Sequence, residues 1–315
     1  MPSVTLLLPE RAQLRGGLLP VIGAALARAD RETGEPGTDA QLARHLDILP
    51  RGWPVAAVTR QQDVGDAHLG AWLRADPAHV RAELNGARLL GFGDALRLTF
   101  EDTAALLPAL KPVFGDAGFM LDAPVPSRWY VQLPREAKLP RFTAPQEALG
   151  ADLFEHLPGS DDASPEARRW RALLTDAQVV LHTHPWNARR EAAGKPAINS
   201  LWFWGGGVLP DHVATRYAQV CTPDTALAAF ARAAGADAQE LPPGWLLPHA
   251  NCLYDLRWIS AVEPLQEDWL PPMLSALCDG GVANAVLDCA DGLQFQLAAA
   301  QRWRFWRRPL STFAA

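Results

Sequence analysis

Residues whose types could form a ligand-binding or catalytic loop are concentrated in the stretch INSLWFWGGG, which spans positions 198–207. A strand that ends in glycines can bring backbone N–H groups close to an anion, provided that a helix follows. Val208, Leu209 and Pro210 follow instead, and no Lys-Ser or Lys-Thr pair is present, so the stretch is not a P-loop. Two interpretations remain open: a ligand-binding loop, or a buried strand whose glycines permit close packing.

Polar residues around this stretch favour the ligand-binding interpretation. Asn199 interrupts an apolar strand, and a buried amide needs partners, which we expect in the preceding segment LHTHPWNARR. An arginine beside an asparagine and glycines can bind a carboxylate or phosphate, although a solvated charged turn fits this segment equally well. We predict a pocket in which Arg190 binds negative charge, Asn199 donates hydrogen bonds and tryptophans form an apolar wall. Its residues are Asn187, Arg190, Asn199, Trp202, Trp204, Gly205, Gly206 and Gly207.

Metal-binding and catalytic patterns are weaker. His182 and His184 are two residues apart, and on a helix such side chains point apart, so they are not expected to share an ion. The four cysteines have no CxxC spacing, and no GxSxG motif marks a serine nucleophile. We predict no catalytic residue, no metal site and no cofactor.

Two further clusters allow alternatives. Asp76 and His79 could act as acid and base, but a set of ion pairs with neighbouring arginines is the favoured interpretation. The segment RWRFWRR, residues 302–308, alternates basic and aromatic side chains. As a strand it would point Trp303 and Phe305 inward, while a nucleic-acid or membrane patch is the alternative.

The charge balance restricts the class of partner. The chain has 35 acidic and 29 basic residues, and its net charge of -6 disfavours a broad footprint on phosphate backbones. No apolar stretch approaches the roughly 18 residues of a membrane span, and the first residues do not resemble a signal peptide. We therefore expect a soluble, cytoplasmic protein with no nucleic-acid and no membrane partner, leaving a small anionic ligand or a protein partner.

Local patterns predict several elements. VTLLL, residues 4–8, indicates a buried strand, and Pro77 suggests that a strand ends near Ala75. Thr99 with Asp102 is typical of a capping box at the start of a helix. The last segment that we expect to pair, ANAVLDC–ADG–LQFQLA, is a C-terminal β-hairpin with Asp291-Gly292 at its turn.

The clearest helix follows Pro165. Apolar residues recur at helical spacing and form one stripe. Those residues are Trp170, Leu173, Leu174, Ala177 and Leu181. Strands and helices mix throughout, so the expected fold class is α/β, with a layered mixed β-sheet flanked by helices. We expect a single domain over residues 1–315, with any boundary between two lobes in the proline-rich stretch 121–145.

Longer stretches resemble a known family. They are WLRADPAHVRAE (72–83), SRWYVQLP (127–134), FTAPQEALGADLFEHLPG (142–159) and LHTHPWNARREAAGKPAINSLWFWGGGVLP (181–210). Together they resemble the bacterial regulatory protein RpfE family, from about Trp72 to the hairpin near Asp291. Members of that family are often labelled phosphoglycerate mutase.

The segment NSLWFWGGG is also similar to the Asn…Trp-x-Trp-Gly-x-Gly segment of cofactor-independent phosphoglycerate mutases. That resemblance implies a serine nucleophile and two metal ions held by Asp and His. This sequence departs from the pattern, because RAQLRGG follows VTLLLPE where the enzymes carry Asp-Gly, and Asp211-His212 is its only Asp-His pair.

Three functions remain open. The first is a regulatory, non-catalytic protein of the RpfE type that binds a small anionic ligand or a protein partner. The alternative is a phosphoglycerate-mutase-related enzyme that acts on a phosphorylated small molecule. A scaffold that binds another protein through exposed tryptophans is the third, and it requires an apolar surface patch instead of a concave pocket.

Overall fold

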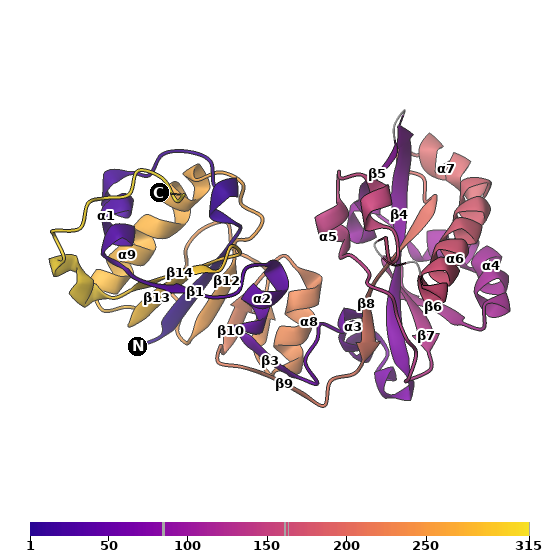
Figure 1. The fold of residues 1–315 in the computed structure, drawn as a ribbon, viewed down its shortest axis with the longest axis horizontal. Helices are drawn as coiled ribbons and strands as arrows, with labels where there is room; N and C mark the ends of the chain where they lie inside the picture. The colour runs from indigo at the N-terminus through magenta and orange to yellow at the C-terminus, as the bar shows by residue number, and fades with distance from the viewer. Residues whose placement is uncertain (84–85, 161, 163, 315) are drawn as a thin grey trace. The chain divides into compact units, whose positions relative to one another are not determined.

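The computed structural model describes residues 1–83, 86–160, 162 and 164–314 (Figure 1). The chain forms two compact units: unit 1 is Met1–Arg51 with Asp211–Ala315, and unit 2 is Gly52–Pro210. Unit 2 is therefore inserted between two segments of unit 1. The proline-rich stretch 121–145 lies inside unit 2. The expected α/β class, with sheets flanked by helices, is confirmed, although the strands are divided among several sheets.

The described part of unit 1 is built around a seven-stranded sheet in the order β11-β10-β12-β1-β13-β14-β2. From β11 to β13 neighbouring strands are parallel, whereas β14 is antiparallel to both β13 and β2. The strands are β1 (Ser3–Leu8), β2 (Asp30–Thr33), β10 (Gln219–Cys221), β11 (Asp237–Gln239), β12 (Cys252–Asp255), β13 (Asn284–Cys289) and β14 (Leu293–Leu297).

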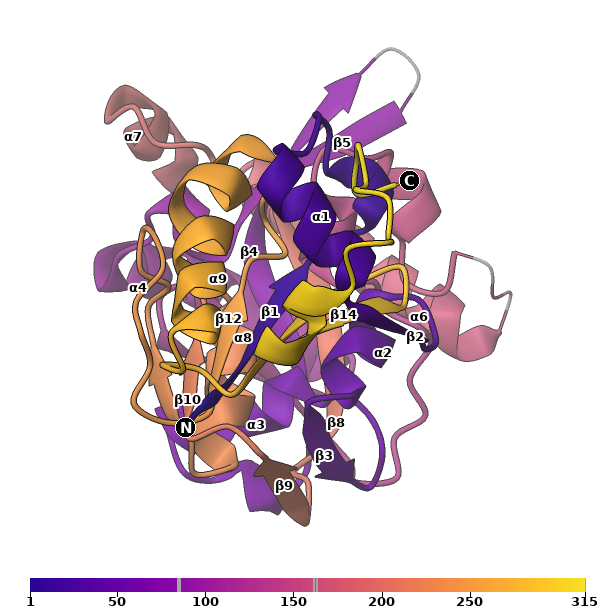
Figure 2. The same ribbon diagram turned by 90° about the vertical axis from the view of Figure 1, so that its left-hand side faces the viewer.

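The two faces of this sheet differ because side chains alternate along each strand. On β1, Val4, Leu6 and Leu8 point into an apolar core that also contains residues of α1 (Pro20–Arg28) and α9 (Leu270–Cys278). Figure 1 shows both helices above β1, and Figure 2 shows the same helices and strand from the left-hand side of that view. The alternate residues of β1 therefore lie on the opposite face, where the sheet is polar.

Smaller elements complete unit 1. Helix α8 (Thr225–Ala233) packs against β10 and β11, and α2 (Thr38–Ala43) lies beside a two-stranded sheet. That sheet pairs β3 (Leu46–Leu49) with β9 (His212–Thr215) in antiparallel register. Asp224 caps the start of α8, because its carboxylate accepts a hydrogen bond from the Ala226 N–H.

The predicted hairpin around Asp291-Gly292 is confirmed by the antiparallel pairing of β13 with β14. The predicted strand over residues 302–308 is wrong. The chain forms a 3₁₀ helix over Ala299–Trp303 and then turns, and Trp303 and Phe305 are 67% and 78% exposed instead of pointing inward.

The described part of unit 2 has a five-stranded antiparallel sheet in the order β5-β4-β7-β6, with β8 also paired to β4. Helices α4 (Phe100–Asp116) and α6 (Pro165–His182) contribute to the main core beside this sheet, whereas α3 (Val55–Asp63) belongs to a separate apolar cluster with Trp72 and Tyr130. The strands are β4 (Ala71–Glu83), β5 (Gly86–Phe92), β6 (Met120–Val125), β7 (Arg128–Leu133) and β8 (Ser200–Val208).

Local signals in unit 2 are confirmed where they concern helices. Thr99 and Asp102 form the predicted capping box at the start of α4. The predicted apolar stripe of α6 is buried from Trp170 to Leu181. The expected strand end near Ala75 is wrong, because β4 continues through Pro77. On one edge of β4, pairing with β7 ends at Arg74 and pairing with β5 begins at Ala78. Pro77 therefore lies in the gap between these two strands, where its missing N–H costs little.

Among the residues that the structure describes, none of the helices combines the length and apolar character needed to cross a bilayer.

Candidate ligand-binding site

Asn199, the central residue of the predicted pocket, bonds to the neighbouring strand. Its Nδ2 donates to the Val80 carbonyl at 2.7 Å, and its Oδ1 accepts from the Val80 N–H at 2.8 Å. The side-chain amide thus imitates a peptide group and extends the pairing of β4 with β8 by one residue. The partners expected in residues 181–190 form no hydrogen bond with the Asn199 side chain. Helix α6 contacts Ser200 instead, whose hydroxyl accepts a hydrogen bond from Gln178.

Asn187 and Arg190 lie in α7 (Trp186–Ala192), and both are buried. The Asn187 amide bonds in both directions with the backbone of Ile198, at 2.8 Å each way. Arg190 Nη1 lies 2.8 Å from the Asp102 carboxylate, and Nη2 donates to the Leu96 carbonyl at 2.7 Å. The guanidinium that was expected to bind a ligand is therefore neutralised by the chain itself.

Asp102 is the carboxylate that joins these elements. Burial opposes its ionisation, but hydrogen bonds from Trp186, Arg190 and Thr99 outweigh burial and lower the pKa of Asp102 to about 2. The acidic member of the capping box of α4 is therefore also the counter-ion of Arg190 in α7.

The tryptophans of β8 are buried and hydrogen-bonded. Trp202 Nε1 donates to the Thr143 carbonyl at 2.9 Å, and Trp204 Nε1 donates to the Asp76 carboxylate at 2.7 Å. Asp76 also forms two hydrogen bonds with Arg74, at 2.7 and 2.8 Å, which confirms an ion pair between these two residues. His79 lies apart from this pair, because its Nδ1 is 2.8 Å from the Ala197 carbonyl. Burial raises the pKa of Asp76 although Arg74 opposes the shift.

Two of the three glycines, Gly205 and Gly207, let α3 lie against β8, whereas a Cβ on Gly206 would lie 2.5 Å from the Leu139 side chain. A Cβ on Gly205 would lie 2.8 Å from the Val55 Cβ, and one on Gly207 would lie 2.8 Å from the Pro54 Cβ. Gly205 also has a φ of 63°, a conformation that residues with a Cβ rarely adopt. Close packing thus accounts for the glycines, and ligand binding by the eight predicted residues stays a prediction.

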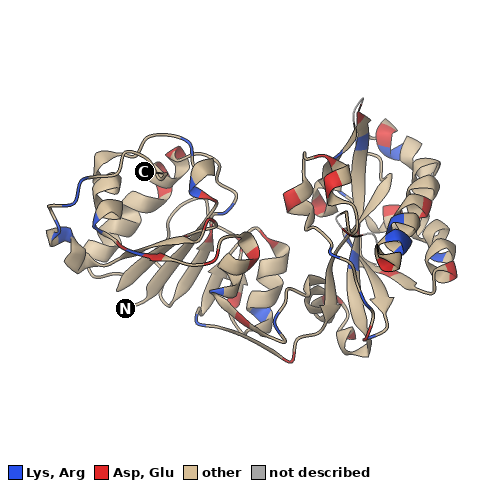
Figure 3. Cartoon of the chain, viewed as in Figure 1, with Lys and Arg blue, Asp and Glu red and all other residues tan. Residues whose placement is uncertain are grey.

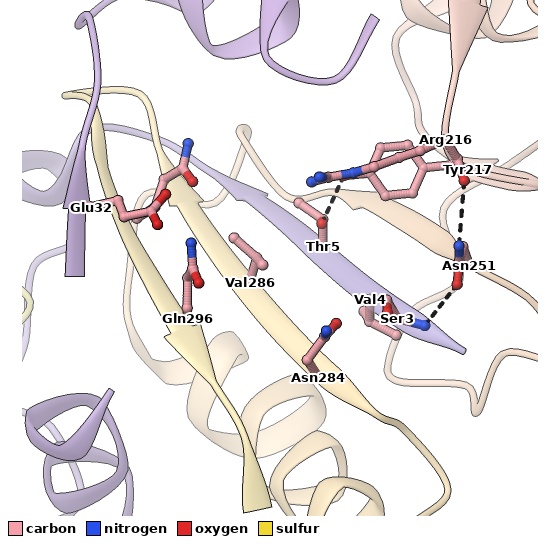
Figure 4. Close-up of a pocket in the computed structure, with 11 residues that line it drawn as sticks. Ser3, Val4, Thr5, Glu32, Arg216, Tyr217, Asn251, Asn284, Val286 and Gln296 are labelled. Carbon is pink, nitrogen blue, oxygen red and sulfur yellow. Dashed lines mark hydrogen bonds between the residues drawn. The ribbon is translucent and has the colours of Figure 1, made fainter. Parts of the chain in front are cut away.

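A polar pocket of about 310 Å³ lies elsewhere, on the polar face of the unit 1 sheet. Its floor follows the strand register from β1 to β2, because Thr5 is opposite Val286, Val286 is opposite Gln296, and Gln294 is opposite Glu32. Figure 4 shows the side chains of Thr5, Val286, Gln296 and Glu32 on one face of the sheet. The lining residues are Ser3, Val4, Thr5, Glu32, Arg216, Tyr217, Asn251, Asn284, Val286, Gln294 and Gln296.

One wall of the pocket is Arg216 and Tyr217, which follow β9. Arg216 is exposed, and its Nε and Nη2 donate to the Tyr217 hydroxyl oxygen at 3.0 and 2.8 Å. The guanidinium also lies 5.1 Å from the centre of the tyrosine ring, within cation–π range. These contacts hold a positive charge beside the amide and hydroxyl groups of the floor, with Glu32 on the opposite side (Figure 4).

Behind this wall lies a buried carboxylate–imidazole–phenol chain. Asp288 Oδ2 is 2.7 Å from His45 Nε2, and His45 Nδ1 is 2.8 Å from the Tyr217 hydroxyl. Arg44 binds the same carboxylate through two nitrogens, at 2.7 and 2.9 Å. Tyr217 lines the pocket, and its phenol is oriented by His45 and Asp288, which do not line the pocket.

The protonation states follow from burial and charge. Burial lowers the pKa of His45 despite Asp288, and burial raises the pKa of Tyr217. Burial also opposes ionisation of Asp288, but hydrogen bonds from His45 and Arg44 outweigh it and lower that pKa. We therefore assign a neutral imidazole that donates from Nε2 to Asp288 and accepts at Nδ1 from the Tyr217 O–H.

Ligands of open α/β sheets usually bind beyond the carboxyl ends of the strands, and this sheet has buried carboxylates there. Asp255 ends β12 and bonds to Arg257 at 2.7 and 2.8 Å, as Asp288 on β13 bonds to Arg44. Over residues 1–83, 86–160, 162 and 164–314, no group of three or more His, Cys, Asp or Glu side chains stands ready to hold a metal ion. These side chains do not fit the two-metal set that the resemblance implies.

The chain is similar to cofactor-independent phosphoglycerate mutases. A probable 2,3-bisphosphoglycerate-independent phosphoglycerate mutase of Geobacter sulfurreducens is 27% identical over 192 residues, which cover 59% of this chain and 46% of the relative. A second mutase of this kind, from Methanothermobacter thermautotrophicus, is 27% identical over 205 residues, 64% of this chain and 48% of the relative. The chain therefore spans about half the length of these curated relatives. No family model matches it.

Two solved structures align over 94% of the chain. They are a cofactor-independent phosphoglycerate mutase of Thermoplasma acidophilum, at 15% identity and a TM-score of 0.41, and a protein of Pyrococcus horikoshii, at 14% identity and a TM-score of 0.46. At these TM-scores the likeness supports no conclusion. The similarity to mutases that the sequence suggested is thus confirmed by the curated relatives, while membership of the RpfE family stays a prediction.

Sequence reasoning missed the pocket of unit 1 for a physical reason. Its lining comes from residues 3–5, 32, 216–217, 251, 284, 286, 294 and 296, which only the fold of unit 1 brings together. One signal was available, because Asn284, Gln294 and Gln296 place amides at alternate positions of the predicted hairpin.

Proposed function

We propose that this chain is a phosphoglycerate-mutase-related protein that binds a small phosphorylated molecule in the polar pocket of unit 1. The position of Arg216 carries the proposal, because an exposed guanidinium held by Tyr217 stands beside a floor of amides and hydroxyls. Guanidinium groups bind phosphate and carboxylate oxygens through paired hydrogen bonds, and amides bind hydroxyls. The names of the curated relatives favour a phosphorylated carboxylic acid as the ligand.

Each wall residue has a distinct role in this proposal. Arg216 binds the anionic group, Tyr217 fixes the guanidinium, and His45 with Asp288 fixes the phenol. The amides of Gln294 and Gln296 face the rest of the ligand from β14. These hydrogen bonds already fix the wall of the pocket, which limits the ordering cost of binding.

Isothermal titration calorimetry with 3-phosphoglycerate tests the proposal, with glycerate as the ligand that lacks the phosphate. The expected result is saturable binding of 3-phosphoglycerate and weaker binding of glycerate. Arg216→Ala is expected to raise the Kd by roughly tenfold or more, the effect of about 1.5–3 kcal/mol for a charged hydrogen bond. Arg232→Ala, which removes an exposed arginine outside the pocket, is expected to leave the Kd unchanged.

Equal Kd values for the two arginine variants would overturn this location of the site. A second function, mutase activity itself, is favoured by the names of the curated relatives. Its test is the interconversion of 3-phosphoglycerate and 2-phosphoglycerate with and without added Mn²⁺. Turnover that survives Arg216→Ala would place the reaction elsewhere in the chain.

A further inference from the structure

The segment Arg302–Arg308 concentrates exposed aromatic and basic side chains on unit 1. Trp303 and Trp306 are each 67% exposed, and Phe305 is 78% exposed. Four arginines fall within these seven residues, and residues 298–315 contain no Asp or Glu. Figure 3 shows their blue colouring at the left-hand margin of the view, on a chain whose net charge is -6.

This exposure does not result from a loose tail, because the segment is fixed on both sides. Before it, the Gln301 amide donates to Asp30 and to the Gln296 carbonyl, both at 3.0 Å. After it, the Leu310 N–H donates to the Gly23 carbonyl at 3.1 Å, and Phe313 is fully buried against Phe295. The segment is therefore a fixed projection whose aromatic side chains are held in water.

The arginines differ in how they are engaged. Arg304 binds the Arg28 carbonyl at 2.9 Å and pairs with Asp30, which holds the segment in place. Within the part of the chain that the structure describes, Arg302, Arg307 and Arg308 form no ion pair with a carboxylate, and Arg302 lies 5.0 Å over the Trp303 ring. Three positive charges thus remain available beside three exposed aromatic rings.

The size of the patch favours a lipid surface over a protein partner. Three aromatic side chains that bury about 150–250 Å² each supply roughly 450–750 Å² even when they are fully covered. A stable protein interface buries about 800 Å² on each partner and needs a complementary shape. A lipid surface requires no complementary shape. It also suits these residue types, since Trp side chains lie at the level of the headgroups and arginines bind the headgroup phosphates.

We propose that Arg302–Arg308 docks unit 1 onto an anionic phospholipid surface. Trp303, Phe305 and Trp306 insert among the headgroups, while Arg302, Arg307 and Arg308 bind lipid phosphates. This proposal replaces the expectation, drawn from the net charge and the lack of a long apolar stretch, that the protein has no membrane partner. It is independent of the proposed ligand pocket, because no residue of the segment lines that pocket.

Vesicle flotation of the full chain tests the proposal, with phosphatidylcholine vesicles compared with vesicles that also contain phosphatidylserine. The expected result is flotation with the anionic vesicles only. The triple variant Arg302→Gln, Arg307→Gln, Arg308→Gln should lower the partition coefficient about tenfold or more, since each basic residue near the surface contributes about a fivefold factor. The triple variant Trp303→Ala, Phe305→Ala, Trp306→Ala should lower it by about tenfold or more as well, because it removes the apolar area that the headgroups would cover.

A matched control removes three aromatic side chains that are also exposed but lie elsewhere: Phe100→Ala, Phe154→Ala, Trp258→Ala. This control should float as the unchanged chain does, and all variants should keep the circular dichroism of the folded chain. No flotation of the unchanged chain, or equal flotation of the aromatic variant, would overturn the proposal. The proposal would also be overturned if the unchanged chain bound no lipid but formed a concentration-dependent dimer or bound a single-stranded oligonucleotide, and the aromatic variant lost that property.

Discussion

The His45 imidazole accepts a hydrogen bond from the Tyr217 hydroxyl across 2.8 Å, although 172 positions separate the two residues in the chain. The bond joins the end of α2 to the segment after β9, and the Thr5 hydroxyl on β1 lies 2.8 Å from the same phenol oxygen. One phenol therefore connects the central sheet of unit 1 with the wall of its polar pocket.

Tyr217→Phe should destabilise the chain by about 1–3 kcal/mol, because it leaves the buried His45 nitrogen and the Arg216 donors without their partner. Urea unfolding measures this change. Tyr254→Phe provides the comparison, since its hydroxyl donates a single hydrogen bond to the Leu246 carbonyl and should cost about 1 kcal/mol. If Tyr254→Phe proved the more destabilising of the two, the phenol of Tyr217 would not have the connecting role assigned to it.

Acidification should reduce the stability of unit 1 through His45. Because burial lowers the pKa of His45 in the folded chain, the unfolded chain binds a proton at a higher pH than the folded chain does. The free energy of unfolding should therefore fall as the pH drops below about 6.5, with a slope of at most about 1.4 kcal/mol per pH unit from this group. His45→Gln should flatten that slope between pH 7.5 and pH 5.

The exposed His249 provides the control for this pH dependence, and His249→Gln should keep the slope of the unchanged chain. Asp288 acts in a lower range. Its pKa is lowered in the folded chain, so its stabilising contribution is complete above its ordinary pKa of about 3.9 and is lost as the pH falls through the folded value. If the free energy of unfolding had the same dependence on pH in His45→Gln and His249→Gln, that result would contradict the neutral, buried state of His45.

Asn199→Ala should destabilise unit 2 by about 1–2 kcal/mol, whether or not this region binds a ligand. The change removes both hydrogen bonds to the Val80 backbone and leaves its N–H and carbonyl without those partners. Thermal unfolding measures the effect, with the exposed Asn284→Ala as a control expected to change stability by less than about 0.5 kcal/mol. An unchanged unfolding temperature for Asn199→Ala would show that water replaces both bonds without loss.

Gly205→Ala should cost about 2–4 kcal/mol, since it adds a steric clash to an unfavourable backbone conformation. The new Cβ would lie 2.8 Å from the Val55 Cβ, at a φ of 63°. Gly194→Ala separates the two effects, because Gly194 has a φ of 67° but no atom within 4 Å of the added Cβ. That control should cost only about 1–2 kcal/mol, and equal losses in chemical unfolding would argue against close packing of α3 on β8.

Local order was readable from the sequence because its causes lie within a few residues. The capping box of Thr99 and Asp102 depends on a spacing of three, the stripe of α6 on helical periodicity, and the hairpin at Asp291-Gly292 on the turn itself. These signals were sufficient for the fold class. The sequence patterns could not show that Asp102 also pairs with Arg190, because 88 positions separate the two residues.

Tertiary structure alone decided which polar side chains line a cavity and which form bonds with other parts of the chain. Asn199 and Arg190 have the chemistry of a binding site, yet β4 and α4 lie close enough to bind them first. Arg216 and Gln296 belong to no recognisable motif, yet the order of the seven strands places both beside one pocket. Likewise, Trp303 and Phe305 alternate as in a buried strand, but the chain forms a 3₁₀ helix over Ala299–Trp303 and then turns, and both side chains are exposed. A residue type determines which bonds a side chain can form, but the neighbours that compete for those bonds arrive only through long-range packing.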